Sequence, residues 1–143
     1  MERSKFLSNL GLGVAAVCVG SCVSACGSGA LYDTPQPVVP AGTSLFTVDL
    51  KTDLVNVGDS KIVGAVIIAR IAAGTTPNSF SAVEVACTHL QAKIKYDVTQ
   101  NVYVCPWHKS IFSTTGQVIT GPAVKDQKKY NVVITSTTLA VLT

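Results

Sequence analysis

The sequence predicts an all-β fold class for the part of the chain that follows residue 42. Short runs rich in Val, Ile, Thr, Tyr and Phe recur along this part, and such runs are typical of strands. Clusters of Gly, Asn, Asp and Ser separate them, as expected for turns. Apolar residues do not recur there at the spacing of a helical face. We therefore expect small antiparallel sheets in one domain, residues 43–143.

The N-terminal half of this domain contains three expected strands. Residues 45–50 are rich in strand formers, and residues 57–60 have the composition of a turn. Residues 62–71 form a nearly continuous apolar run, which is typical of a strand buried on both faces. Residues 80–85 are the third strand, and it ends just before Cys87.

The C-terminal half is expected to form two hairpins and two closing strands. In chain order, the strand residues are 94–96, 102–104, Phe112, Val118, 130–135 and 138–142. The first hairpin turns at residues 97–101 and the second at Thr115-Gly116. The first hairpin sets the spacing between two sequence boxes that each contain a cysteine and a histidine.

The N-terminus has the layout of a bacterial export signal, which we place at residues 1–25. Arg3 and Lys5 precede residues 6–32, which contain no charged residue and are rich in Gly, Ala, Val and Leu. An uncleaved signal anchor is the alternative, because this run exceeds the roughly 18 apolar residues that span a bilayer.

Small residues precede Cys26, in the order Val-Ser-Ala, and this pattern resembles the lipobox of bacterial lipoproteins. Cys26 is therefore the expected lipidation site, and Cys22 and Cys18 fit the pattern less well. Residues 26–42 are expected to form a tether and a Pro-rich, extended linker. The predicted localisation is that of an exported, membrane-anchored lipoprotein that faces the periplasm or the cell exterior.

The remaining two of the five cysteines belong to a four-ligand pattern in the folded part. The two boxes are Cys87-Thr88-His89 and Cys105-Pro106-Trp107-His108. Structural zinc sites usually group like ligands on one element. A cluster of two inequivalent irons instead takes two thiolates on one iron and two imidazoles on the other. The order cysteine then histidine in both boxes favours the cluster, and structural zinc is the alternative.

These boxes resemble the signature of the Rieske [2Fe-2S] family, which is Cys-x-His followed after a spacer by Cys-x-x-His. The similarity continues downstream and covers roughly the last two thirds of the chain, through Ser110-Ile111-Phe112, Thr114-Thr115-Gly116 and Gly121-Pro122-Ala123. The resemblance implies the Rieske fold, in which two ligand hairpins form an inserted cluster-binding subdomain, here about residues 86–123. It also implies one [2Fe-2S] cluster with Cys87, His89, Cys105 and His108 as cofactor and metal ligands.

The resemblance further indicates the ferredoxin-like subtype, which lacks a disulfide. High-potential members carry an extra cysteine in each box, where this chain has Ala92 and Trp107. Those members also donate hydrogen bonds to the cluster from a serine, matched by Ser110, and from a tyrosine, replaced by Phe112. Losing a donor destabilises the reduced state, so we expect a low to middle potential within the Rieske range of roughly −150 to +300 mV.

Four other side chains are expected beside the cluster. Lys109 stands where the family usually has glycine, which leaves the loop geometry open. Its ammonium either favours reduction from close by or extends into water. Leu90, Trp107 and Pro122 are candidates for an apolar rim that contacts a partner, and packing in the core is the alternative use of Trp107.

Composition argues against several other functions. The net charge of +3 comes without a dense Lys/Arg run, so we expect no nucleic-acid partner. With both histidines used as ligands, no imidazole is left to activate a Ser or Thr nucleophile. We therefore predict no catalytic residues, no activity of its own and no small-molecule substrate.

The leading functional hypothesis is one-electron transfer by a membrane-tethered carrier, or by an electron-transfer subunit of a periplasmic or membrane oxidoreductase. Its partners would be a redox protein that donates electrons and another that accepts them, with the membrane held through the lipid anchor. The alternatives are the Rieske subunit of a quinol-oxidising complex and a non-redox binding module stabilised by zinc.

Overall fold

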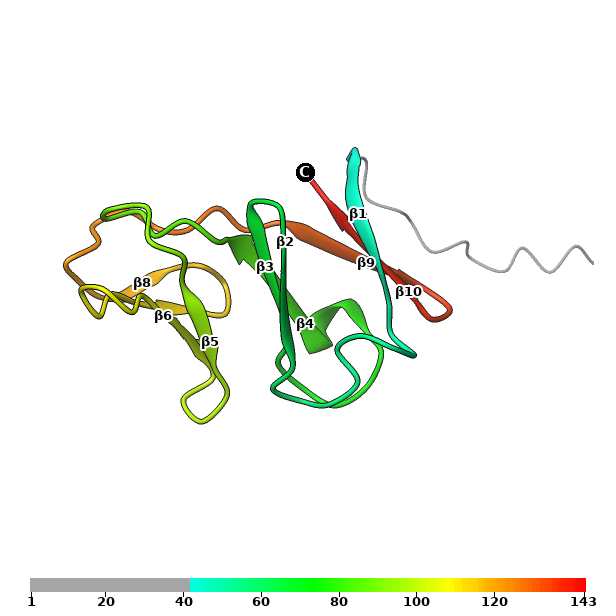
Figure 1. Ribbon diagram of the computed structural model, residues 1–143. Coiled ribbons are helices and arrows are strands. Elements are labelled where there is room, and N and C mark those ends of the chain that lie inside the picture. Colours follow the sequence, from blue (N-terminus) through cyan, green and yellow to red (C-terminus); the bar gives the residue numbers. More distant parts are fainter. Residues whose placement is uncertain (1–41) are drawn as a thin grey trace, which may run out of the picture. The chain divides into compact units, whose positions relative to one another are not determined.

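The computed structural model describes residues 42–143, and these residues fold into three small antiparallel sheets (Figure 1). The predicted all-β class is confirmed, since the described residues contain ten strands and one 3-10 turn. In this part of the chain no helix is long and apolar enough to cross a membrane. The predicted export signal, the predicted lipidation site Cys26 and the predicted linker up to residue 41 lie outside the described residues.

The first sheet joins the two ends of the described chain. Its order is β1-β10-β9, with β1 at Ser44–Asp49, β9 at Asn131–Thr135 and β10 at Thr138–Leu142. The last two strands are the predicted closing strands, and they pair as a hairpin in which Thr138 lies opposite Thr135.

The second sheet has the order β2-β3-β4, with β2 at Ser60–Val63, β3 at Val66–Arg70 and β4 at Phe80–Glu84, which follows the 3-10 turn Pro77–Ser79. Here the prediction of one strand over residues 62–71 is wrong. Val63 pairs with Val66, so a two-residue turn folds the apolar run back on itself. Gly64 has φ +57°, a conformation that glycine adopts without steric cost and that such turns require.

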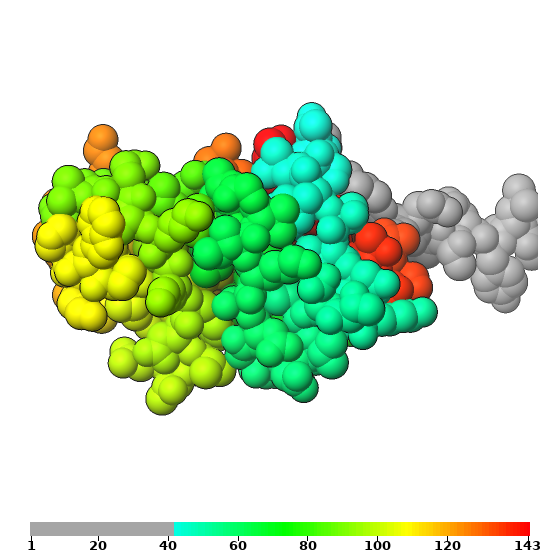
Figure 2. Space-filling view, in the orientation of Figure 1, coloured from blue at the N-terminus to red at the C-terminus, as the bar shows by residue number. Residues whose placement is uncertain are grey.

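The third sheet contains both predicted hairpins and has the order β5-β6-β7-β8. Its strands are β5 at Lys95–Asp97, β6 at Val102–Val104, β7 at Ile111–Ser113 and β8 at Val118–Thr120. One cysteine–histidine box precedes β5 and the other connects β6 to β7. Figure 2 shows the residues around position 110, in yellow, at the opposite end of the described part from cyan β1.

The second sheet is a layer shared by two cores. Ile67 and Val83 pack into one core together with both cysteines. Ile68 and Ala82 pack into the other, against the first sheet. Successive strand residues point to opposite faces, so this sheet buries both faces and connects the cysteine-containing core to the base of the fold.

Residues 121–130, which we call the return segment, lead from the cysteine-containing half back to the base. They run along β4, where Glu84 N–H donates to Lys128 O at 2.8 Å and Tyr130 N–H donates to Ala82 O at 2.9 Å. A second connection is buried: the Tyr103 hydroxyl donates to Ser81 Oγ at 2.9 Å. These contacts hold the third sheet against the second.

Candidate metal centre

The two predicted ligand loops, residues 87–92 and 105–110, share one backbone pattern. In each loop the N–H of the fifth residue donates to the cysteine carbonyl, and the cysteine N–H donates to the carbonyl of the sixth. The bonds are Gln91 N to Cys87 O (2.8 Å), Cys87 N to Ala92 O (2.8 Å), Lys109 N to Cys105 O (3.0 Å) and Cys105 N to Ser110 O (2.9 Å). The cysteines are therefore held in equivalent backbone positions.

The fifth residue of each loop lies in the left-handed region. Gln91 has φ 60° and Lys109 has φ 61°. Lys109 thus adopts the conformation that a glycine would take, at a steric cost of roughly 1–2 kcal/mol for an L-residue. The loop geometry that the sequence left open is the same as that of the 87–92 loop, so the lysine does not disturb it.

The two thiols lie together in the core, with exposed fractions of 0% for Cys87 and 1% for Cys105. Burial raises the pKa of Cys87, and the neighbouring Cys105 thiol raises it further. Burial also acts to raise the pKa of Cys105, but the backbone N–H groups of His108 and Trp107, the Cys87 thiol and the Lys109 ammonium outweigh it and lower the pKa.

The two imidazoles lie at the surface side of the same loops. The ring centroids of His89 and His108 are 5.0 Å apart, with an interplanar angle of 82°. His108 is exposed and His89 is half-buried. Nδ1 of His89 is buried and has no hydrogen-bond partner. An unpaired buried nitrogen is costly, and coordination of a metal would satisfy it.

Within residues 42–143, no group of three or more Cys, His, Asp or Glu side chains is placed to hold a single metal ion. The four predicted ligands instead lie as a pair of thiols and a pair of imidazoles. This donor set, together with the unpaired Nδ1 of His89, fits a two-iron cluster with one iron held by thiolates and the other by imidazoles.

The return segment contacts both ligand loops. The Thr88 hydroxyl donates to Lys125 O at 2.6 Å, and Ala123 N–H donates to Ser110 Oγ at 3.0 Å. Pro122 lies next to Ala123 and is exposed, after a cis peptide bond from Gly121. Sequence reasoning did not single out Thr88, because ligand spacing does not reveal which distant segment lies beside a loop.

The remaining predicted site residues have contrasting environments. Ser110 is 0% exposed, and since its Oγ accepts from Ala123, its own O–H hydrogen is free to be donated elsewhere. Phe112 is also fully buried. Leu90 and Trp107 are 54% and 66% exposed, so Trp107 is not a core residue in this structure.

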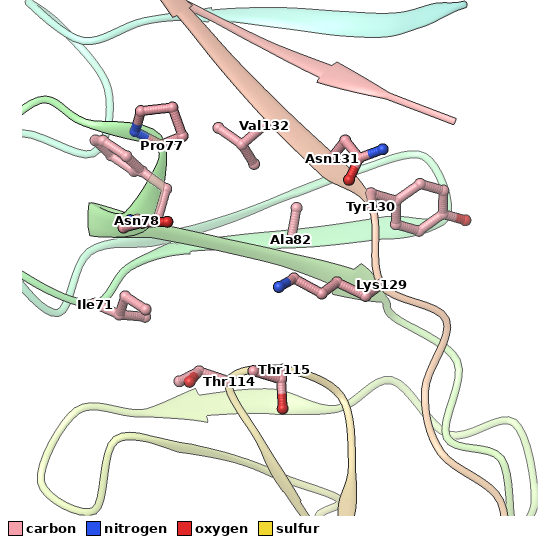
Figure 3. A pocket seen from close by; sticks show the side chains of 11 residues that line it. Ile71, Pro77, Asn78, Ala82, Thr114, Thr115, Lys129, Tyr130, Asn131 and Val132 are labelled. Carbon is pink, nitrogen blue, oxygen red and sulfur yellow. The ribbon is translucent and has the colours of Figure 1, made fainter. Parts of the chain in front are cut away.

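A separate cavity of about 300 Å³ lies between the second sheet, β9 and the turn that follows β7 (Figure 3). Lys129 extends into it, and Asn78, Thr115 and Asn131 line it. Its lining includes neither a predicted ligand nor a carboxylate. It is therefore not part of the metal centre.

Comparison with known proteins identifies the family. The family model for the Rieske [2Fe-2S] domain matches residues 46–131. The chain belongs to the Rieske family. The Rieske domain carries one [2Fe-2S] cluster, and this replaces the zinc alternative. Membership of this family supports Rieske-type electron transfer as the function.

Rieske proteins of photosynthetic bacteria are among the relatives. The cytochrome b6-f complex iron-sulfur subunit of Chlorobaculum thiosulfatiphilum is 30% identical over 137 residues, which cover 90% of this chain and 68% of that subunit. The corresponding subunit of Synechococcus elongatus is 43% identical over 37 residues, which are 26% of this chain. That match spans only 21% of the length of the subunit.

A solved structure confirms the Rieske fold. The plasma membrane Rieske protein PetC3 from Synechocystis PCC 6803 superimposes with a TM-score of 0.55. The superposition covers 68% of this chain and 99% of that protein at 24% sequence identity. The similarity concerns the fold alone.

The Thr88 hydrogen bond gives a testable prediction. Replacing Thr88 with Val keeps the side-chain shape but removes the bond to Lys125 O. Because this bond holds the 87–92 loop to the return segment, the variant should lose its cluster several-fold faster on warming, followed as bleaching of the visible absorbance. Thr47→Val, an exposed position on β1, is the control. Bleaching of Thr88→Val at the wild-type rate would contradict the role.

Proposed function

We propose that this protein is a one-electron carrier whose cluster is held by Cys87 and Cys105 on one iron and by His89 and His108 on the other. The observation that carries the proposal is the convergence of two buried thiols and two adjacent imidazoles on two loops of equal backbone geometry. The cluster supplies the ability to accept and release a single electron. The side chains around the cluster set its midpoint potential and determine at which surface the electron enters and leaves.

The imidazole pair is the side through which electrons enter and leave. Both thiols are buried, whereas His108 is exposed and lies directly after the exposed Trp107. A partner can approach the His108 edge without any rearrangement of the core. Leu90 on the 87–92 loop adds apolar surface at the same end, so the two loop tips together form a contact surface for a redox protein.

The midpoint potential follows from three residues. Ser110 can donate its hydroxyl hydrogen to the cluster, and Phe112 has no hydroxyl to donate. Lys109 acts electrostatically on Cys105, which favours the more negative, reduced state. With one hydroxyl donor in place of two, and with one nearby cation, we propose the low to middle part of the Rieske range. This is the ferredoxin-like subtype.

The carrier is proposed to work at a membrane surface, as an exported lipoprotein anchored through Cys26. The support is the lipobox-like pattern and the uncharged run before it. Labelling of the producing cells with radioactive palmitate tests this: wild type should be labelled and Cys26→Ala should not. Equal labelling of both, or labelling of neither, would refute anchoring through Cys26.

A second candidate is the Rieske subunit of a quinol-oxidising complex. The similarity to a cytochrome b6-f iron-sulfur subunit across 90% of this chain favours it. Ala92 and Trp107 at the positions of the second cysteine pair, and Phe112 at the position of the tyrosine, count against it. We therefore keep the tethered carrier as the main proposal.

The ligand assignment predicts which variants retain the cluster and which lose it. Purified wild-type protein should contain two irons and two acid-labile sulfides per chain and give a [2Fe-2S] electron paramagnetic resonance signal after reduction. Replacing any one of Cys87, His89, Cys105 or His108 with Ala should abolish the signal. Gln91→Gly, which suits the left-handed backbone of the same loop, should retain it. A full signal in any of the four Ala variants would overturn the assignment.

The Ser110 hydroxyl predicts a change in potential. A hydrogen bond to a charged group contributes about 1.5 kcal/mol, which corresponds to about 60 mV for a one-electron couple. Ser110→Ala should therefore lower the midpoint potential by tens of millivolts in a redox titration. Ser60→Ala, on the exposed strand β2, should leave it unchanged. A midpoint that is the same in Ser110→Ala and wild type would remove Ser110 from the account.

A further inference from the structure

The charges of the described residues are distributed unevenly. Residues 86–130 carry a net charge of +4, from Lys93, Lys95, Lys109, Lys125, Lys128 and Lys129 against Asp97 and Asp126. The rest of residues 42–143 carry a net charge of −1, from Lys51, Lys61 and Arg70 against Asp49, Asp53, Asp59 and Glu84. The half of the domain that contains the ligand loops is therefore the positive one.

Two of these lysines lie at one shallow cavity of about 420 Å³ beside the 105–110 loop. Lys95 and Lys109 are both exposed and contribute to its lining, together with the apolar side chains of Val98 and Pro106. The cavity is open to solvent, and two of its lining residues, Pro106 and Lys109, belong to the same loop as His108. A partner that contacts this loop on both sides would cover the cavity and the exposed His108 together.

The two lysines are available to a partner. Among the described residues, the one ion pair joins Lys61 to Asp53. Asp97, the carboxylate that also lines the cavity, accepts hydrogen bonds from the backbone N–H groups of Thr99 and Gln100. The backbone of Lys109 is fixed in a left-handed conformation as part of the 105–110 loop.

We propose that the surface of the ligand loops, with Lys95 and Lys109 at the cavity and Leu90 and Trp107 exposed on the two loops, docks an acidic redox protein, which exchanges one electron with the cluster at the His108 edge. This inference rests on the proposed electron-transfer function. Carboxylates of the partner would pair with the two lysines, and its apolar surface would cover Trp107 and Leu90. One electron passes between the redox group of the partner and the cluster, and no atom is transferred.

Charge complementarity is the reason for proposing an acidic partner. A surface with a net positive charge attracts a negatively charged protein and increases its rate of encounter by about 10-fold or more at low salt. At physiological ionic strength the Debye length is about 8 Å, so the attraction acts over the last few ångströms of approach. The rate of electron transfer should therefore depend steeply on salt, and part of this dependence should come from Lys95 and Lys109.

The test uses oxidised, cluster-containing protein and a dithionite-reduced, acidic plant-type [2Fe-2S] ferredoxin as the probe. Plant-type ferredoxins have potentials near −400 mV, so electron transfer to the Rieske cluster is downhill. Stopped-flow rates are measured from low to high NaCl. The wild-type rate should fall about 10-fold or more over this range. Lys95→Gln/Lys109→Gln should be several-fold slower at low salt and clearly less dependent on salt than wild type.

The control variant is Lys51→Gln/Lys61→Gln, which removes the same charge from the base half of the domain. The exposed ion pair between Lys61 and Asp53, which this variant loses, contributes little to stability. This variant should keep the wild-type salt dependence. The midpoint potential of each variant is measured as well, because a change in driving force alters the absolute rate but not its dependence on salt.

Two results would overturn the proposal. One is a salt dependence in Lys95→Gln/Lys109→Gln equal to that of the control variant. The other is that vesicles of phosphatidylcholine and phosphatidylglycerol bind wild type but not the double variant, while the salt dependence of electron transfer is the same in both. That outcome would assign the surface of the ligand loops to a membrane. Absence of a [2Fe-2S] signal from wild type would refute the proposed function itself, which keeps the two failures apart.

Discussion

The structure depends on the closure of two short loops by backbone hydrogen bonds. Each loop begins at a buried cysteine, turns through a left-handed residue and returns its sixth residue to the cysteine N–H. This closure places N–H groups near the thiols, and those of His108 and Trp107 act to lower the pKa of Cys105. Because both loops are built alike, the two cysteines meet in the core and the two histidines meet at the surface.

The second sheet and the return segment hold these two loops in place. The second sheet packs into two cores at once, so the cysteine-containing core is continuous with the base of the fold. The return segment accepts a hydrogen bond from Thr88 and donates one to Ser110, and it is itself paired to β4. Positions 92 and 107 hold no cysteine, so these hydrogen bonds and the packing of the core hold the loops together. The stability of the two loops therefore depends on the second sheet and the return segment.

Local patterns predicted the ligand boxes, the hairpin between them and the closing strands, because each depends on residues close together in the chain. The run over residues 62–71 was misjudged, since its composition does not show that Gly64 starts a tight turn. The hydrogen bond from Thr88 to Lys125 spans 37 residues, and no local pattern encodes it. Lysine itself gives no sign of a left-handed backbone, so the glycine that the family usually has at position 109 was the one indication of this conformation.

The central claim is that both histidines bind the same iron of one cluster. The chain contains two histidines in all, so labelling with ¹⁵N-histidine marks these imidazoles and no others. Pulsed electron paramagnetic resonance of the reduced, labelled protein is the most direct measurement. The account predicts ¹⁵N couplings from two imidazole nitrogens. A [2Fe-2S] signal with no ¹⁵N coupling, or with coupling from a single imidazole, would contradict it.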